Sequence, residues 1–296
     1  MTSVPTLDRE RVSPNTIVEP GPAAAGGIAS HAAMCLRLEL ETWPKPGLVS
    51  HVDSGSHQDM DADTFRNSVA AIEPYFCQLA IAGSQGASMI RLKAIGLEAE
   101  VAMLDATRGV NTHRGAIFGL GLLCAAVGAR THGVVGRQAT LGQSVSELWG
   151  REIAELPASP SSHGASVVRK FEVGGARMEA ACGFPSVYKV GLPALRRARR
   201  TPFGKGDAPR VEACFALIEA LEDTNLLYRG GSEGLRFAQR MAKQFLDEGG
   251  TNRAEWRDFA LAVHLCFIAR GLSPGGSADL LAMTLFVDVY DKEGSP

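Results

Sequence analysis

The chain has 296 residues, of which 45% are hydrophobic and 21% are charged, and its formal net charge at pH 7 is -2. This charge balance argues against a nucleic-acid-binding surface, because such surfaces rely on many Lys and Arg contacts to phosphates. No hydrophobic run approaches the roughly 20 residues that a membrane span needs. We therefore expect neither a nucleic acid nor a membrane as a partner.

Six cysteines occur singly and without C-x-x-C spacing, at positions 35, 77, 124, 182, 214 and 266. This pattern predicts reduced, mostly buried thiols in a cytoplasmic protein rather than disulfides or zinc ligands. Residues 1–22 combine prolines with acidic residues, so we predict a flexible N-terminal leader there. One domain is expected to follow over residues 23–296.

The first half of the chain shows hydrophobic residues at helical spacing. The spacing predicts helices over residues 23–42, from Asp61 or Asp63 to about 83, over 89–107, and from Ala116 onwards. Between the first two, Pro44, Pro46 and Gly47 exclude a continuous helix. Thr140 and Gln143 predict a capping box for a short helix that ends near residue 149.

The second half follows a loop-like stretch at residues 155–166, which is a candidate domain boundary. Residues 165–181 are compatible with a helix, and the glycines and prolines of 182–193 interrupt the pattern. Further helices are predicted from Pro209 to Gly230 and Gly231, over 232–248, from Asn252 to Gly271, and after 271–279. Strand-like alternation is scarce, so we predict an all-α fold of about nine or ten helices in a single globular domain.

Polar residues gather with glycines at five joints between the predicted helices, namely residues 41–61, 109–115, 174–185, 222–231 and 271–279. Glycines ahead of a helix let backbone N–H groups approach a phosphate at the positive end of the helix dipole. Taken singly, each joint is explained more simply by helix capping. The common phosphate-binding loops, a Ser nucleophile elbow and an H-E-x-x-H helix are absent from the sequence.

The joints carry carboxylates and positive groups in one chain. The acids are of the type that binds Mg²⁺ together with a phosphate, although each also suits a helix cap or a solvated surface: Asp59, Asp61, Glu179, Asp223 and Asp279. The positive groups suit phosphates, although each also suits an ion pair or a solvated face: Lys45, His113, Arg114, Arg177, Lys189 and Arg229.

Together the joints resemble one family, the triphosphoribosyl-dephospho-CoA synthases, which make the prosthetic-group precursor of citrate lyase and malonate decarboxylase. The resemblance rests on TWPKPGLVSHVDSGSHQDMD, GVNTHRGAIFGLGLL, DTNLLYRGG and SPGGSADLLA, which span residues 42–282 in this order. The first stretch looks more like the malonate decarboxylase branch. The resemblance implies an all-α pentosyltransferase that converts ATP and 3'-dephospho-CoA to 2'-(5''-triphosphoribosyl)-3'-dephospho-CoA and adenine. The product would pass to a carrier-protein transferase.

Breaking the N-glycosidic bond of ATP builds positive charge on the sugar and negative charge on adenine, so the site needs carboxylates and a general base. We hypothesise that Asp59, Asp61 and Glu179 include the Mg²⁺ ligands and the base, with His57 as an alternative base. Lys45, His113 and Arg114 would hold phosphates, and Asp223 and Asn225 would orient a ribose. The other candidate nucleotide-binding residues are Asn111, Arg177, Lys189, Arg229, Gly275 and Gly276.

Two other functions fit the same residues. One is a Mg²⁺-dependent N-glycoside hydrolase acting on an ADP-ribose-like nucleotide, for which water replaces dephospho-CoA as the acceptor. The other is a catalytically silent helical protein that binds a nucleotide or a carrier subunit. The sequence leaves the oligomeric state open, with a homodimer as one option.

Overall fold

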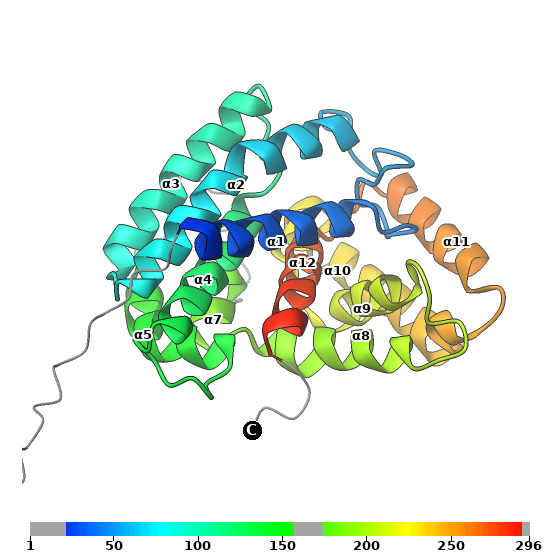
Figure 1. The fold of residues 1–296 in the computed structure, drawn as a ribbon. Coiled ribbons are helices and arrows are strands. Elements are labelled where there is room, and N and C mark those ends of the chain that lie inside the picture. Colours follow the sequence, from blue (N-terminus) through cyan, green and yellow to red (C-terminus); the bar gives the residue numbers. More distant parts are fainter. Residues whose placement is uncertain (1–21, 157–173, 292–296) are drawn as a thin grey trace, which may run out of the picture.

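The structure is a computed structural model that describes residues 22–156 and 174–291. Within these ranges it contains eleven α-helices, one π-helix and one 3-10 helix, and it contains no strand (Figure 1). The predicted all-α class is therefore confirmed. The predictions for the leader and for residues 157–173 lie outside the described residues.

The N-terminal half consists of five helices: α1 (Pro22–Leu40), α2 (Ala62–Ser84), α3 (Met89–Ala106), α4 (Arg114–Thr131) and α5 (Leu141–Glu155). Helix α2 packs against α1, α3 and α4, and α5 covers the far end of α4. The C-terminal half contains α7 (Gly175–Ala181), the π-helix η1 (Val187–Gly191), α8 (Leu192–Arg199), α9 (Ala208–Ala220), α10 (Thr224–Asp247), the 3-10 helix η2 (Gly250–Asn252), α11 (Trp256–Ala269) and α12 (Gly275–Tyr290).

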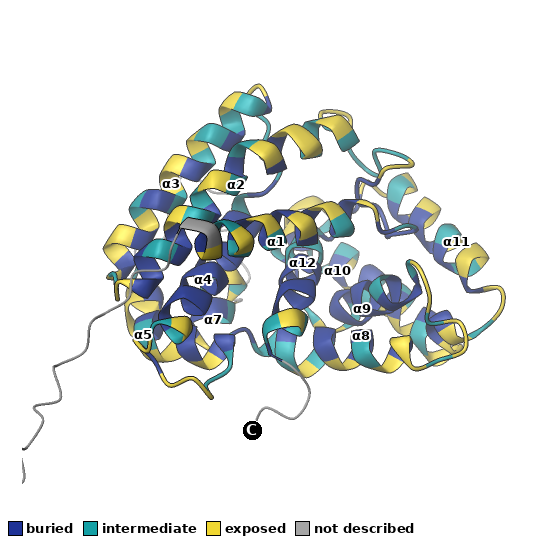
Figure 2. Ribbon diagram, viewed as in Figure 1, coloured by how far each residue is buried: buried dark blue, intermediate teal, exposed yellow. Residues whose placement is uncertain are grey.

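Helix α12 joins the two halves, because it packs against α1 and α4 on one side and against α9 on the other. Figure 2 shows α12 and α4 buried along most of their length, whereas α3 and α8 have exposed faces. One continuous hydrophobic core, which runs from α1 to α12, fills the space between the helices. The N-terminal turn of α12 therefore lies between elements that are far apart in the sequence.

Two helix starts confirm the capping residues predicted from the sequence. Asp61 caps α2 through a capping box with Thr64, and Thr140 caps α5 through a capping box with Gln143. Each box satisfies backbone N–H groups that have no partner within the helix. Of the two candidates for the start of α2, the cap is Asp61 rather than Asp63.

The structure corrects several predicted boundaries. Residues 187–199 form η1 and α8, although the sequence predicts that the helical pattern is interrupted over residues 182–193. Helix α5 continues to Glu155, beyond the predicted end near residue 149. The helix predicted from Pro209 to the Gly230 and Gly231 pair is two helices, because Leu221 is extended and Asp223 caps a new start. The predicted helix end at Gly230 and Gly231 is confirmed, because Gly231 has the non-helical angles φ 60 and ψ -163 and α10 consists of two helical segments that meet there across a kink. Glycine tolerates this conformation.

No helix in the described part of the chain is long and hydrophobic enough to cross a membrane, as the sequence predicted.

The backbones of α2 and α4 are in direct contact, and this contact generates a test of the packing. A Cβ added at Gly83 would lie 2.0 Å from the carbonyl oxygen of Ala125, whereas one added at Gly96 in α3 would meet nothing within 4 Å. We expect Gly83→Ala to reduce the free energy of unfolding by about 1–3 kcal/mol, because the two helices must separate. Gly96→Ala should instead increase it by about 0.5–1 kcal/mol, because alanine restricts the unfolded chain. Urea denaturation of both variants measures this difference, and equal effects would contradict the close packing.

Candidate active site

Three of the five polar joints meet around the backbone that precedes α12. In the 41–61 loop, the Ser56 hydroxyl donates to the carbonyl oxygen of Leu272 at 2.6 Å, and His57 Nε2 lies 2.9 Å from the Ser273 hydroxyl. From α10, the Arg229 guanidinium donates to the carbonyl oxygens of Gly271, at 3.1 Å, and Ser56, at 3.3 Å. Residues 41–61, 222–231 and 271–279 therefore form one continuous site.

The Asp223 carboxylate connects the N-termini of α10 and α12. One carboxylate oxygen accepts from the backbone N–H of Asn225 at 2.9 Å, which caps α10. The other accepts from the backbone N–H and the hydroxyl of Ser277, at 2.8 and 3.0 Å. A Cβ at Gly276 would lie 3.1 Å from the same carboxylate, so a glycine leaves room for this close approach. Asp223 is 1% exposed, and burial raises its pKa although these hydrogen bonds oppose the change.

The Asp279 carboxylate connects α12 to the start of α4, which brings the 109–115 joint to the same place. Asp279 accepts a hydrogen bond from the backbone N–H of Ala116, and a Cβ at Gly115 would lie 2.1 Å from the carboxylate oxygen. Burial and the nearby negative charges of Glu39 and Asp223 raise the pKa of Asp279 well above its usual range. The N-termini of α4, α10 and α12 thus meet around two carboxylates.

A buried ion pair lies beside these carboxylates. The Lys45 ammonium contacts the Glu39 carboxylate at the end of α1, and Lys45 is 0% exposed. Burial raises the pKa of Glu39, which Lys45 partly counteracts. Because Lys45 is fully buried, the predicted contact with a phosphate would require its surroundings to open.

His113 is buried directly before α4. Its Nδ1 lies 2.7 Å from the Ser68 hydroxyl of α2, and its ring meets Phe65 edge-on at 4.8 Å between centroids. Burial and the Lys45 charge lower its pKa to about 3, so the imidazole is neutral at physiological pH. Its Nε2 has no hydrogen-bond partner in the described part of the protein. Because buried polar atoms are normally paired, this nitrogen is an unsatisfied polar atom in the interior.

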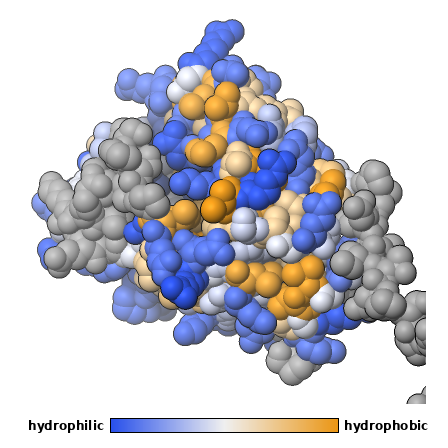
Figure 3. All heavy atoms as spheres, turned by 90° about the vertical axis from the view of Figure 1, so that its left-hand side faces the viewer, coloured by the Kyte–Doolittle hydropathy of each residue, from blue (hydrophilic) through white to orange (hydrophobic). Residues whose placement is uncertain are grey.

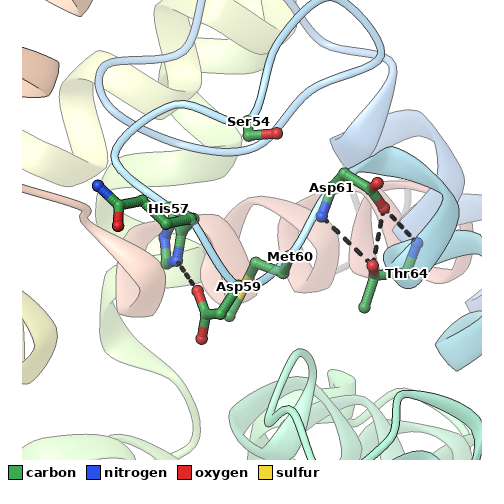
Figure 4. Close-up of a pocket in the computed structure, with 7 residues that line it drawn as sticks. Ser54, His57, Asp59, Met60, Asp61 and Thr64 are labelled. Carbon is green, nitrogen blue, oxygen red and sulfur yellow. Dashed lines mark hydrogen bonds and ion pairs between the residues drawn. The ribbon is translucent and has the colours of Figure 1, made fainter.

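The open part of the site is a polar hollow of about 240 Å³ at the end of the 41–61 loop. It is lined by Ser54, His57, Gln58, Asp59, Met60, Asp61 and Thr64. Figure 4 shows the Asp59 carboxylate turned toward the His57 ring, with Asp61 on the other side of Met60 against Thr64. The hollow therefore brings together three of the four residues predicted as catalytic.

Within the hollow, the charge state of His57 depends on two neighbours. Its Nδ1 lies 3.1 Å from the Arg229 guanidinium and 3.7 Å from the Asp59 carboxylate. Burial and the Arg229 charge lower the pKa of His57, whereas Asp59 raises it. Hydrogen bonds from Thr64 lower the pKa of Asp61, which is fully exposed. Asp59 and Asp61 are both exposed, so each has carboxylate oxygen available for a ligand.

The remaining residues near the site have partners in the structure. Asn111 accepts from the backbone N–H of Arg114 at 3.2 Å, and the Arg114 guanidinium donates to Glu100 at 2.9 Å. Asn225 is exposed, and a Cβ at Gly275 would lie 2.8 Å from its amide nitrogen. Gly275 and Gly276, both predicted to bind the nucleotide, therefore lie directly against polar side chains at the start of α10.

The joint at residues 174–185 lies elsewhere. Glu179 accepts from the backbone N–H of Ser186 at 2.7 Å and from its hydroxyl at 3.0 Å. Two residues further on, the Tyr188 hydroxyl donates to Asp291 at 2.6 Å, at the C-terminal end of α12. The 16 residues of α12 rise about 24 Å from the end near His57 to this one. Arg177 donates to the carbonyl oxygen of Leu156, and Lys189 is exposed on η1. The structure does not bring Glu179 to Asp59 and Asp61.

Divalent-metal binding was the second part of the hypothesis for these acids. In the described ranges, no three His, Cys, Asp or Glu side chains are placed to hold a metal ion together. Mg²⁺ that arrives with a triphosphate needs only one or two carboxylates, because phosphates and water supply its other oxygens. Asp59 and Asp61 fit that smaller requirement.

Sequence reasoning missed Glu39 and understated Asp279. Glu39 lies near the end of an ordinary helical pattern, and nothing in the sequence distinguishes it from a solvated acid. Asp279 was one of five candidate Mg²⁺ ligands, with helix capping or a solvated surface as the alternative, but it does not cap α12, for which no side-chain cap is present. The run of small residues around it, together with Gly115, was the available signal of a crowded junction.

Comparisons with known proteins identify the family of the chain. Residues 25–295 match the family model described as ATP:dephospho-CoA triphosphoribosyl transferase. A probable 2-(5''-triphosphoribosyl)-3'-dephosphocoenzyme-A synthase from Azotobacter vinelandii is 40% identical over 274 residues, which cover 91% of this chain and 93% of the relative. The synthase of that name from Pectobacterium atrosepticum is 38% identical over 276 residues, which cover 90% of each chain. No solved structure matches.

The chain is accordingly an enzyme of the transferase class. It belongs to the ATP:dephospho-CoA triphosphoribosyl transferase family, whose model covers nearly all of it.

The geometry around His57 predicts opposite effects of its two charged neighbours. Arg229→Met should raise the pKa of His57, because it removes a nearby positive charge. Asp59→Asn should lower it, because it removes the negative charge that favours the imidazolium. NMR titration of histidine-labelled protein measures both shifts, with His57→Gln used to assign the signal. A His57 pKa that is unchanged in both variants would contradict the described contacts.

The raised pKa of Asp279 predicts a dependence of stability on pH. The folded protein holds this proton more tightly than the unfolded chain, so wild-type stability is lost as pH rises from the unfolded pKa of about 3.9 toward the folded value. Asn cannot ionise, so the melting temperature of Asp279→Asn relative to wild type should increase from pH 4 to pH 8.

Asp288→Asn is the matched control for this measurement. Burial raises the pKa of Asp288, but hydrogen bonds from Arg196 and Arg199 outweigh burial and lower it. Its ionised form therefore stabilises the fold, and this contribution is complete above the unfolded pKa of about 3.9, so Asp288→Asn should be less stable than wild type by a nearly constant amount from pH 5 to pH 8. Differential scanning fluorimetry across the same buffers distinguishes this constant difference from the rising one expected for Asp279→Asn. Parallel curves for both variants would contradict the assignment.

Proposed function

We propose that this transferase moves the 5-triphosphoribosyl group of ATP to the 2'-hydroxyl of 3'-dephospho-CoA and releases adenine. The observation that carries the proposal is the convergence of four joints, at residues 41–61, 109–115, 222–231 and 271–279, where three helix N-termini meet. These joints contain the four stretches that resemble the family. Partial positive charge at helix N-termini favours a phosphorylated ligand.

The reaction exchanges one bond to the anomeric carbon for another. The C1–N9 bond of ATP breaks, its electron pair leaves with adenine, and the acceptor oxygen bonds to C1. The acceptor hydroxyl gives its proton to a base, and adenine takes up a proton as it leaves. The triphosphate stays on the product, so the site must neutralise it without hydrolysing it.

The hollow supplies the groups for this chemistry. Asp59 and Asp61 expose carboxylates on either side of Met60, and His57 lies between Asp59, Ser273 and Arg229. We assign proton removal from the acceptor hydroxyl to Asp59, Asp61 or His57. A neutral His57 suits this role because burial and Arg229 disfavour its charged form.

The nucleotide would lie between this hollow and the helix N-termini. The Nε2 atom of His113 is buried without a partner, and Asn225 is exposed at the start of α10 beside Gly275. Asn225 is placed to bind phosphate or ribose oxygens, whereas His113 would do so only once its buried ring is uncovered. Asp59 and Asp61 would hold Mg²⁺ that enters with the triphosphate, with phosphate and water completing its coordination.

The next point is which enzyme's carrier protein receives the finished prosthetic group. We assign the enzyme to the malonate decarboxylase branch because of its first motif, WPKPGLVSHVDSGSHQDMD. The product would then pass to a separate carrier-protein transferase. A cytoplasmic location fits the free cysteines, of which Cys35, Cys124 and Cys214 are buried.

Incubation with ATP, Mg²⁺ and 3'-dephospho-CoA, followed by mass spectrometry, tests the reaction. The expected products are adenine and the coupled triphosphoribosyl compound in equal amounts. Free ribose triphosphate without coupled product would instead identify an N-glycoside hydrolase. Tight ATP binding without release of adenine would identify a silent nucleotide-binding protein.

Charge removal in the hollow tests the residue assignments. Asp59→Asn and Asp61→Asn should each abolish release of adenine, because they remove proposed metal or proton contacts. The melting temperature should stay near wild type, since Asn replaces Asp well as the α2 cap. Asp63→Asn is the control, because this exposed acid lies outside the hollow and pairs with Arg66. Wild-type turnover by both site variants would discard the assignment.

A further inference from the structure

Helix α3 has a second hydrophobic face that its own chain leaves exposed. The helix buries Met89, Leu92, Ile95, Ala99 and Met103 against the protein. On the opposite side, apolar residues recur at alternating steps of four and three: Ile90, Ala94, Leu97, Val101 and Leu104, of which Ala94 and Leu104 are half-buried and Leu104 also packs against the core. Three of them are large and mostly exposed, with Ile90 at 79%, Leu97 at 51% and Val101 at 58%. This is the repeat with which one helix packs along another.

The exposed stripe lies on an outer surface of the molecule. Helix α3 packs mainly on α2 and α4, and it forms the upper left edge of the fold in Figure 1. Figure 3 faces that side and shows hydrophobic patches in its upper half, among hydrophilic atoms. A row of exposed hydrophobic side chains of this kind, flanked by charges, is typical of a protein interface.

The charges beside the stripe divide the helix into two parts. Arg91 and Lys93 lie in its first two turns, and Glu98 and Asp105 lie in its second half. None of these four side chains has an ion-pair partner within the described residues, and all four are exposed. A helix that is basic at one end and acidic at the other is complementary to a copy of itself that runs in the opposite direction.

We propose that two copies of this chain form a dimer by antiparallel packing of α3 about a two-fold axis near Leu97. In this register Ile90 lies opposite Leu104 of the second copy, and Ala94 lies opposite Val101. Arg91 lies opposite Asp105, so each contact occurs twice, as two-fold symmetry requires. The two Glu98 side chains lie nearest the axis at the outer edge of the stripe, where water solvates them. Parallel packing would instead place like charges at the same level.

The first test is the mass of the full-length protein by analytical ultracentrifugation. Wild type should sediment as a dimer, and Leu97→Glu should raise the dimer dissociation constant at least tenfold, because it places two like charges at the axis. Leu265→Glu is the control, since Leu265 is 55% exposed on α11 and should leave the dimer intact. Circular dichroism verifies that both variants stay folded. A monomeric wild type, or equal effects of the two variants, overturns the proposal.

The second test addresses the direction of packing. Arg91→Glu and Asp105→Arg should each weaken the dimer, and the double variant should restore it, because the exchanged charges again face each other. Failure of the double variant to recover would overturn the antiparallel register even where Leu97→Glu disrupts the dimer. These readouts need no catalytic assay, so they are independent of the proposed reaction.

Discussion

The buried contact between Lys45 and Glu39 determines how the 41–61 loop meets the helices. A charge buried without a partner costs several kcal/mol, so this loop conformation depends on both members of the pair. The backbone carbonyl of Lys45 also lies 2.6 Å from His264 Nδ1 of α11, and the N–H of Gly47 lies 3.2 Å from the same nitrogen. One residue thereby ties the loop to both α1 and α11. The hollow that contains Asp59 lies at the other end of this loop, next to α2.

The interior beside this pair contains more acid than base. Glu39, Asp223 and Asp279 lie close enough for their charges to interact, with Lys45 as their ammonium counterpart. Burial raises the pKa of all three carboxyls, so each favours its neutral form more than a solvated acid does.

Helix positions and the crowded glycines could be predicted from the sequence, because both depend on local backbone preferences. The partners of the charged residues could not, because packing between distant helices decides them. Lys45 was expected at a phosphate and is paired with Glu39, while Glu179 shared the composition of the site but packs at the other end of α12. Asp61 is a capping residue and a member of the hollow at once, so the two interpretations of it were not exclusive.

Gly231 divides α10 into two segments, one that contributes side chains to the site and one that packs in the core. The segment before it places Asp223 against the start of α12 and Arg229 against the 41–61 loop, and the segment after it buries Leu235, Ala238 and Phe245 in the core. In a straight helix, the axis direction that buries the core residues would also fix the position of the Arg229 guanidinium. The bend removes that dependence. Sequence changes in the core-facing turns can therefore accumulate without redirecting the side chains at the site, so stability and substrate recognition are free to evolve separately within one helix.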